Sequence, residues 1–211
     1  MENDTPNKIK ISKEIIATLP IETFPGKIVV IDNERDADNA VFQLNNERII
    51  GFDTETRPTF KKGKSNHVAL IQLSTHDTCY LFRINRIGFT PAIKNLLENE
   101  SLLKVGISLK DDFCMLSRLN GGQFIPRNFI ELQKFVKKYN IEDQSLQKIY
   151  GIVIGKKISK GQRLSNWEAD HLTENQQLYA ATDAWSCIKI YEVLKSGKFK
   201  SPIYKIQPSS L

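Results

Sequence analysis

Four acidic residues and one tyrosine are the side chains most able to do chemistry in this 211-residue chain. They are Asp53, Glu55, Asp112, Asp183 and Tyr179, and each acid interrupts an otherwise apolar segment. A buried carboxylate is costly unless it is paired or holds a metal. Carboxylate oxygens are the ligands that hard divalent cations prefer. With only three histidines in the chain, the acids indicate a cation site built from oxygen ligands.

The first two acids follow the apolar run Ile49-Ile-Gly-Phe52, which is typical of a central strand. Alternate strand residues share a face, so Asp53 and Glu55 should project to the same side and could share a cation. Taken alone, the Asp-x-Glu pattern is common. It is equally compatible with a strand that ends at Asp53 and leaves both acids in solvent.

The third acid lies in a predicted helix over residues 109–119. Asp112 is three residues after Leu109 and four before Leu116, so it should point toward the packed side, whereas Asp111 should point into solvent. The competing interpretation is that Asp112 is simply an acid near a helix N-terminus, where the helix dipole favours it.

The last pair lies in a predicted helix over residues 173–194. Tyr179 and Asp183 are one turn apart, and their face continues through Cys187, Ile190 and Leu194, as a core stripe does. An acid within such a stripe needs a partner, and the tyrosine hydroxyl can reach it. The alternative is a tyrosine–aspartate hydrogen bond at the edge of a core.

The elements that must position these residues follow from hydrophobic periodicity and turn signals. Strands are expected over 27–31, 48–54, 67–74, 78–83, 102–107 and 129–132. Helices are expected over 12–19, 36–45, 91–99, 109–119, most of 133–151, and 173–194. Hairpins followed by alternating strands and helices predict an α/β protein with a mixed sheet covered by helices.

Composition narrows the class of protein. The formal charge of +6 favours a polyanionic partner, and no apolar run approaches the ~18 residues of a membrane span. The first residues have neither a basic start nor an apolar core, so no secretory signal is expected and a cytoplasmic location follows. Cys79, Cys114 and Cys187 lie in apolar stretches and are interpreted as reduced core thiols.

Together, the three acidic segments resemble the DEDD superfamily of 3′–5′ exonucleases, and within it the domains of ribonuclease D and the Werner-syndrome helicase. Asp53-x-Glu55 matches the first motif, and residues 68–73 and 79–82 look like the Werner-type hairpin. The segment Leu164-Ser-Asn-Trp167 is similar to ribonuclease D sequences.

The second and third motifs define the subclass. Asp112 matches the second motif, although Ser108 and Asp111 stand where many relatives carry Asn and an aromatic residue. Tyr179-x-x-x-Asp183 matches the third. The histidine subclass would have His five residues before the last Asp, where this chain has Leu178, so the resemblance implies the tyrosine subclass.

The resemblance implies a ribonuclease H-like fold with a mixed five-stranded sheet flanked by helices. It implies an exonuclease domain over residues 27–195, with an N-terminal extension over 1–26 and a C-terminal tail over 196–211. It also implies two Mg²⁺ or Mn²⁺ ions, held by the four acids, and a water oriented by Tyr179.

The expected substrate is single-stranded or 3′-recessed DNA or RNA, cleaved to nucleoside 5′-monophosphates. Glu131, at the end of a candidate strand, is a possible accessory acid. The candidate substrate contacts are Thr54, Lys61, Lys62, Lys64, Lys160 and Arg163, most of them in two basic loops that could meet phosphates. The sequence leaves protein partners open.

Three alternatives remain at this point. The chain could be a catalytically weak nucleic-acid-binding module on the same fold, or an unrelated ribonuclease H-like endonuclease. It could also be an α/β protein unrelated to nucleic acid, whose acids are surface charges. A circular substrate separates an exonuclease from an endonuclease, and metal titration tests the last alternative.

Overall fold

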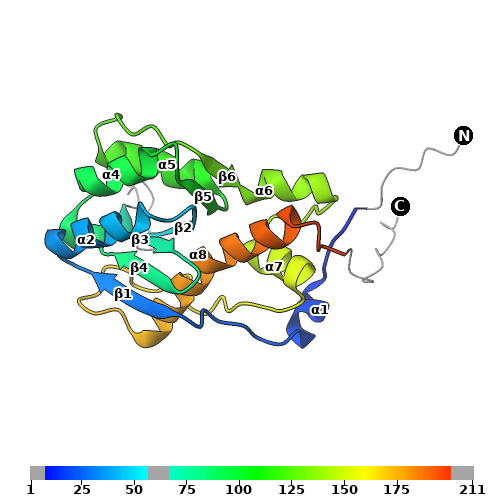
Figure 1. Ribbon diagram of the computed structural model, residues 1–211. Helices are drawn as coiled ribbons and strands as arrows, with labels where there is room; N and C mark the ends of the chain where they lie inside the picture. The colour runs from blue at the N-terminus through cyan, green and yellow to red at the C-terminus, as the bar shows by residue number, and fades with distance from the viewer. Residues whose placement is uncertain (1–7, 57–66, 201–211) are drawn as a thin grey trace, which may run out of the picture.

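A mixed sheet forms the centre of the structure, a computed structural model that describes residues 8–56 and 67–200 (Figure 1). Its strand order is β1-β4-β3-β2-β5-β6. β3 runs antiparallel to both neighbours, and all other paired strands are parallel. The strands are β1 (Lys27–Ile31), β2 (Ile49–Thr56), β3 (Val68–Ser74), β4 (Thr78–Phe82), β5 (Leu103–Gly106) and β6 (Phe129–Glu131).

Within the described residues the sheet has six strands rather than the expected five. Both edges are extended by short strands: β1 pairs parallel with β4, and β6 pairs parallel with β5. Both edge segments are predicted as strands from their apolar pattern. The number five comes from the resemblance to the family, and that number is wrong for this chain. The α/β class and the mixed sheet are confirmed.

Helices cover both faces of this sheet (Figure 1). α2 (Glu34–Leu44), α4 (Pro91–Glu98) and α5 (Leu109–Leu119) share one apolar cluster with the sheet. α7 (Leu146–Ile154) and α8 (Glu174–Lys195) pack in two further clusters, on the other face. α8 begins at a capping box formed by Thr173 and Gln176, which agrees with Thr173 as the expected N-cap.

The segment expected to be mostly helical over 133–151 is interrupted. α6 (Leu132–Phe135) passes into a 3₁₀ helix, η1 (Val136–Tyr139), which ends at Asn140 with φ of 59°. The following residue, Ile141, is fully buried and forms a β-bridge with Ile9. This long-range pairing requires extended backbone, so the helical pattern cannot continue to α7.

Residues before β1 also contribute to the core. α1 (Lys13–Thr18) and the chain around it bury Ile11, Ile16 and Phe24. Remaining short helices include α3 (Ile84–Ile87). None of the helices in the described ranges combines the length and apolarity needed to cross a membrane.

The cysteine interpretation is correct in two cases out of three. Cys79 and Cys187 are buried, but Cys114 is exposed. Cys114 lies on α5 two residues after Asp112, on the solvent side of that helix. The neighbouring apolar residues face the sheet, so the local apolar context did not predict the direction of this side chain.

Candidate active site

The central strand β2 carries the first two acids on one face. Asp53 pairs with Gln72 of β3, and Glu55 pairs with Leu70. Phe52 points to the opposite face, where it is fully buried in the cluster shared with α5. Asp53 and Glu55 share the other face, as the spacing predicts. This face lies toward α8, because their carboxylate oxygens come close to that of Asp183.

The last helix approaches β2 closely because Gly51 has no side chain. A Cβ atom at this position would lie 1.9 Å from the carbonyl oxygen of Ala184. The next residue toward the N-terminus of α8 is Asp183, so this contact places its carboxylate beside β2. One carboxylate oxygen each of Asp53, Glu55 and Asp183 lie within 4.8 Å of one another.

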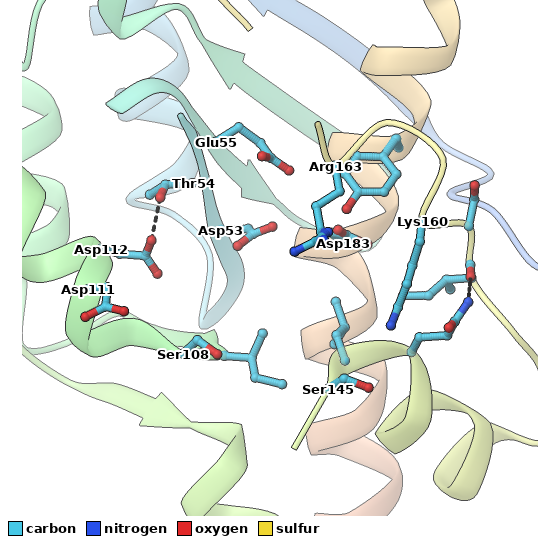
Figure 2. Close-up of a pocket in the computed structure, with 16 residues that line it drawn as sticks. Asp53, Thr54, Glu55, Ser108, Asp111, Asp112, Ser145, Lys160, Arg163 and Asp183 are labelled. Carbon is cyan, nitrogen blue, oxygen red and sulfur yellow. Dashed lines mark hydrogen bonds between the residues drawn. The ribbon is translucent and has the colours of Figure 1, made fainter. Parts of the chain in front are cut away.

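The fourth acid lies apart from this group of three. Asp112 extends from α5, and Figure 2 shows it on the side of Asp53 away from Asp183. The Thr54 hydroxyl donates a hydrogen bond of 2.5 Å to its carboxylate. Asp112 is half-buried whereas Asp111 is exposed, as the helix phase predicts.

The start of α5 is held by an acid from the edge strand. Ser108 has φ of 60°, and its side chain does not cap the helix. Instead the carboxylate of Glu131 accepts hydrogen bonds from the N–H groups of Ser108 (3.1 Å), Leu109 (2.8 Å) and Gln133 (3.0 Å). Glu131, expected as an accessory acid, therefore fixes the turn that positions Asp112.

Burial is the main cause of the raised pKa values of the four acids at this site. Burial, and then repulsion from Asp183, Glu55 and Asp112, raise the pKa of Asp53 well above its ordinary value. Burial, and then the charges of Asp183 and Asp112, raise the pKa of Glu55 to about 9. Carboxylates gathered in this way repel one another and bind protons unless a cation offsets their charge.

The pKa values of the remaining two acids are raised less, because polar groups nearby oppose the effect of burial. Burial raises the pKa of Asp183 to about 7, against the interactions with the Tyr179 hydroxyl and the charge of Lys160. Burial raises the pKa of Asp112 to about 6, against the hydrogen bond from Thr54. Four acids with elevated pKa values around one cavity are typical of a functional site.

Tyr179 lies one helical turn before Asp183, on the same side of α8. Its side chain is 8% exposed and its ring centroid is 6.1 Å from that of Trp167, which is fully buried. Burial, followed by the charges of Asp183 and Glu55, raises the pKa of Tyr179. The hydroxyl therefore stays protonated and can donate a hydrogen bond at the edge of the acid cluster.

A cavity of about 650 Å³ opens above the acids (Figure 2). Lys160 and Arg163 line it, and the charge of Arg163 opposes the rise in the pKa of Glu55. Neither cation forms an ion pair with another residue in the described part of the chain. The other predicted basic loop, with Lys61, Lys62 and Lys64, lies outside the described residues.

Several residues of the cavity wall were not predicted from the sequence. Ser145, Leu146 and Gln147 reach it because α7 begins there, and Ile158 and Ser159 reach it from the loop that follows α7. These residues form no charged motif and no regular pattern. One local signal was present: serine is a preferred N-cap residue, and Ser145 is the N-cap of α7.

A mixed sheet with helices on both faces, and carboxylates from three segments at one open cavity, define an α/β protein with a candidate site for divalent cations. A family model described as 3′–5′ exonuclease matches residues 28–197, and the chain belongs to this family.

Two relatives illustrate the sequence similarity. The chain is 34% identical over 208 residues to the bifunctional 3′–5′ exonuclease/ATP-dependent helicase WRN of Mus musculus, covering 90% of this chain and 14% of that protein. It is 30% identical over 174 residues to a 3′–5′ exonuclease of Arabidopsis thaliana, covering 80% of this chain and 57% of that protein. The chain thus spans less than two thirds of the length of each.

Solved structures show the same fold. The Nibbler EXO domain of Aedes aegypti matches with a TM-score of 0.74 and 23% identity, over 83% of this chain and 91% of that one. RNase D of Escherichia coli matches with a TM-score of 0.72 and 20% identity, over 82% of this chain and 45% of that one. The expected ribonuclease H-like fold is confirmed.

Proposed function

We propose that this chain is a metal-dependent 3′–5′ exonuclease. It hydrolyses phosphodiester bonds at the 3′ ends of DNA or RNA, single-stranded or 3′-recessed, and releases nucleoside 5′-monophosphates. The observation that carries the proposal is the cluster of Asp53, Glu55 and Asp183, whose oxygens lie within 4.8 Å of one another at an open cavity. Membership of the exonuclease family supports it.

The donor set fits Mg²⁺ or Mn²⁺, because both ions prefer carboxylate and water oxygens. Asp53, Glu55, Asp112 and Asp183 would hold two such ions, and the first, second and fourth of these acids are close enough to share one. Two such ions would supply an activated water and stabilise the charge on the leaving oxygen. The elevated pKa values of the four acids agree with this, since a cation would offset the repulsion that raises them.

The remaining residues would bind and orient the reactants. The protonated Tyr179 hydroxyl orients the attacking water, while Lys160 and Arg163 hold the phosphates of the strand. Attack of the water oxygen on phosphorus breaks the bond to the 3′ oxygen of the preceding nucleotide, which takes up a proton. The terminal nucleotide leaves with the phosphate on its 5′ oxygen. Thr54, Lys61, Lys62 and Lys64 are further candidate substrate contacts.

The alternative is a catalytically weak nucleic-acid-binding module on the same fold. A pure binder has no use for carboxylates near a phosphate backbone, because they repel it. The cluster of three acids, with Asp112 beside it and a protonated tyrosine at its edge, favours catalysis.

The first prediction is tested with 3′- and 5′-labelled single-stranded and recessed-end DNA and RNA, in Mg²⁺, Mn²⁺ or EDTA. We expect a metal-dependent ladder that shortens from the 3′ end and leaves a circular strand intact. Asp53→Ala should abolish it. Tyr179→Phe should lose about 10²-fold or more, the usual contribution of a positioned proton-transfer or orienting group, and still bind metal.

The control is Asp38→Ala, which removes an exposed acid on α2 and should cleave normally. Undiminished cleavage by Asp53→Ala would refute the site. Full turnover by Tyr179→Phe would refute the role given to its hydroxyl. Metal binding without cleavage of any substrate would support the binding-module alternative.

A further inference from the structure

A second groove adjoins the candidate catalytic cavity on the side of α5. It has a volume of about 910 Å³ and lies between the first turn of α5, β6 and the helical segment formed by α6 and η1. Ser108 and Asp111 line both this groove and the catalytic cavity, so the two lie side by side. Figure 2 shows both residues on the α5 side of the catalytic cavity.

Three lysines line this α5 groove: Lys110, Lys134 and Lys137. All three are exposed, and none forms an ion pair with another residue in the described ranges. Two acids also line the groove. Asp111 stands at the junction with the catalytic cavity, and the carboxylate of Glu131 is engaged by three backbone N–H groups.

The basic side chains continue beyond the groove. A further hollow of about 480 Å³ shares Lys137 and Gln144 with it. Lys8 and Lys10 line this hollow, and both pair with Glu142, at 2.5 and 2.9 Å. Their charge is therefore partly neutralised, and the three unpaired lysines of the α5 groove are the stronger anion ligands.

The opposite side of the catalytic cavity differs in charge. There a smaller hollow of about 280 Å³ shares Ser159 and Tyr179 with the catalytic cavity. Among the residues that the structure describes, those lining it are polar and uncharged or apolar. Successive phosphates of a strand need cations along their path. Among the described residues that line these two neighbouring hollows, cations occur in the α5 groove alone.

We propose that the α5 groove binds the single-stranded segment on the 5′ side of the scissile bond, with Lys110, Lys134 and Lys137 contacting its phosphates. This inference rests on the proposed exonuclease function, which places the 3′ end at the acids. The half-buried rings of Phe113 and Phe129 line the same groove and give it an apolar floor against which bases can lie. The contacts position the strand without reading its sequence.

The test compares Lys110→Ala/Lys134→Ala/Lys137→Ala with a matched control, Lys13→Ala/Lys27→Ala/Lys195→Ala. The control removes three exposed lysines that line none of these hollows. Binding of labelled 3-mer and 12-mer DNA and RNA is measured by fluorescence anisotropy in EDTA, so that strands are not cut, between 50 and 200 mM salt. Thermal melting confirms that each variant is folded.

Each phosphate contact on a single strand contributes about 0.7 to the slope of log affinity against log salt, so the groove variant should lose about 2 from this slope. Its preference for the 12-mer over the 3-mer should fall on the order of tenfold. Replacing the same lysines by Arg should keep both. Comparing the affinities for RNA and DNA strands of the same length shows which of the two nucleic acids the groove prefers.

Equal slopes for the groove variant and the control would overturn the inference. So would an equal loss on the 3-mer and the 12-mer, because the lysines would then act at the acid site itself. If the slope falls as expected but the unmodified protein cleaves nothing in Mg²⁺ or Mn²⁺, the groove stands and the exonuclease proposal fails.

Discussion

At the scale of single residues, the acid cluster makes stability depend on pH and on metal. The folded pKa values of Asp112, Asp183 and Glu55 are about 6, 7 and 9, above the ordinary carboxyl values of 3.8 and 4.5. The folded protein therefore keeps protons that the unfolded chain has released. This contribution to stability is fully present below about pH 4 and declines as pH rises through the folded pKa values.

We expect the free energy of unfolding in EDTA to fall between pH 5 and 7.5, by about 1.4 kcal/mol per pH unit for each proton retained by the folded state. Mn²⁺ or Mg²⁺ should restore stability far more at pH 7.5 than at pH 5, because the ions bind the deprotonated acids. Thermal or urea unfolding with and without metal measures both effects.

Asp183→Asn should flatten this pH dependence, and Asp38→Asn on the surface should not. The window stops at pH 7.5 because burial lowers the pKa of Lys104 to about 8, and the resulting change in stability has the opposite sign. A pH-independent melting temperature in EDTA would show that the acids are not buried together in the folded protein.

At the scale of elements, the site depends on the contact between β2 and α8. Gly51→Ala would place a Cβ atom 1.9 Å from the carbonyl oxygen of Ala184, so the helix must shift away from the strand. We expect a loss of about 3 kcal/mol in stability, at the upper end of the usual cost of overpacking. Metal should stabilise the variant less than the unmodified protein, because Asp183 moves with the helix.

Gly161→Ala is the control for stability, since its Cβ atom would meet only Ser159 Oγ, at 3.4 Å. Urea unfolding with and without Mn²⁺ measures both quantities. If Gly51→Ala unfolds at the same urea concentration as the unmodified protein, β2 and α8 do not approach each other as closely as in this structure.

At the scale of the whole molecule, the segment before β1 is tied to the last two helices through Glu22. Its carboxylate accepts hydrogen bonds from Lys156 (2.8 Å), Lys189 (2.9 Å) and the Tyr150 hydroxyl. These bonds outweigh the effect of burial and lower the pKa of Glu22 to about 2. The amide of Phe24 adds a bond of 3.0 Å to the Thr182 hydroxyl of α8.

We expect Glu22→Ala to cost about 2 kcal/mol at pH 7, less than a fully buried ion pair because the group is partly exposed. The lowered pKa means that this stabilisation is present above about pH 4.5 and is lost as pH falls toward 2. The difference in stability between the variant and the unmodified protein should therefore be much smaller at about pH 2.5 than at pH 7. Urea unfolding at both pH values measures this, with the exposed Glu14→Ala as control, and equal effects of the two substitutions would contradict the role of Glu22.

The local pattern of the sequence was enough to predict most elements and the faces of the acids. The strand spacing of Asp53 and Glu55, the helix phase of Asp112 against Asp111, and the capping of α8 at Thr173 depend on neighbours within a few residues. Hydrophobic periodicity predicts such local contacts directly. The expectation that the three acidic segments meet came from the resemblance to a known family.

Tertiary packing decided which groups actually meet. It separates Asp112 from the other three acids, uses Glu131 as a helix cap, breaks the helical pattern at Ile141 and brings Lys160 and Arg163 over the cluster. Each of these depends on contacts between residues far apart in the chain, or on a loop without periodicity. Local pattern holds no information on such distances, because they are set by how close the helices can pack against the sheet, as Gly51 shows.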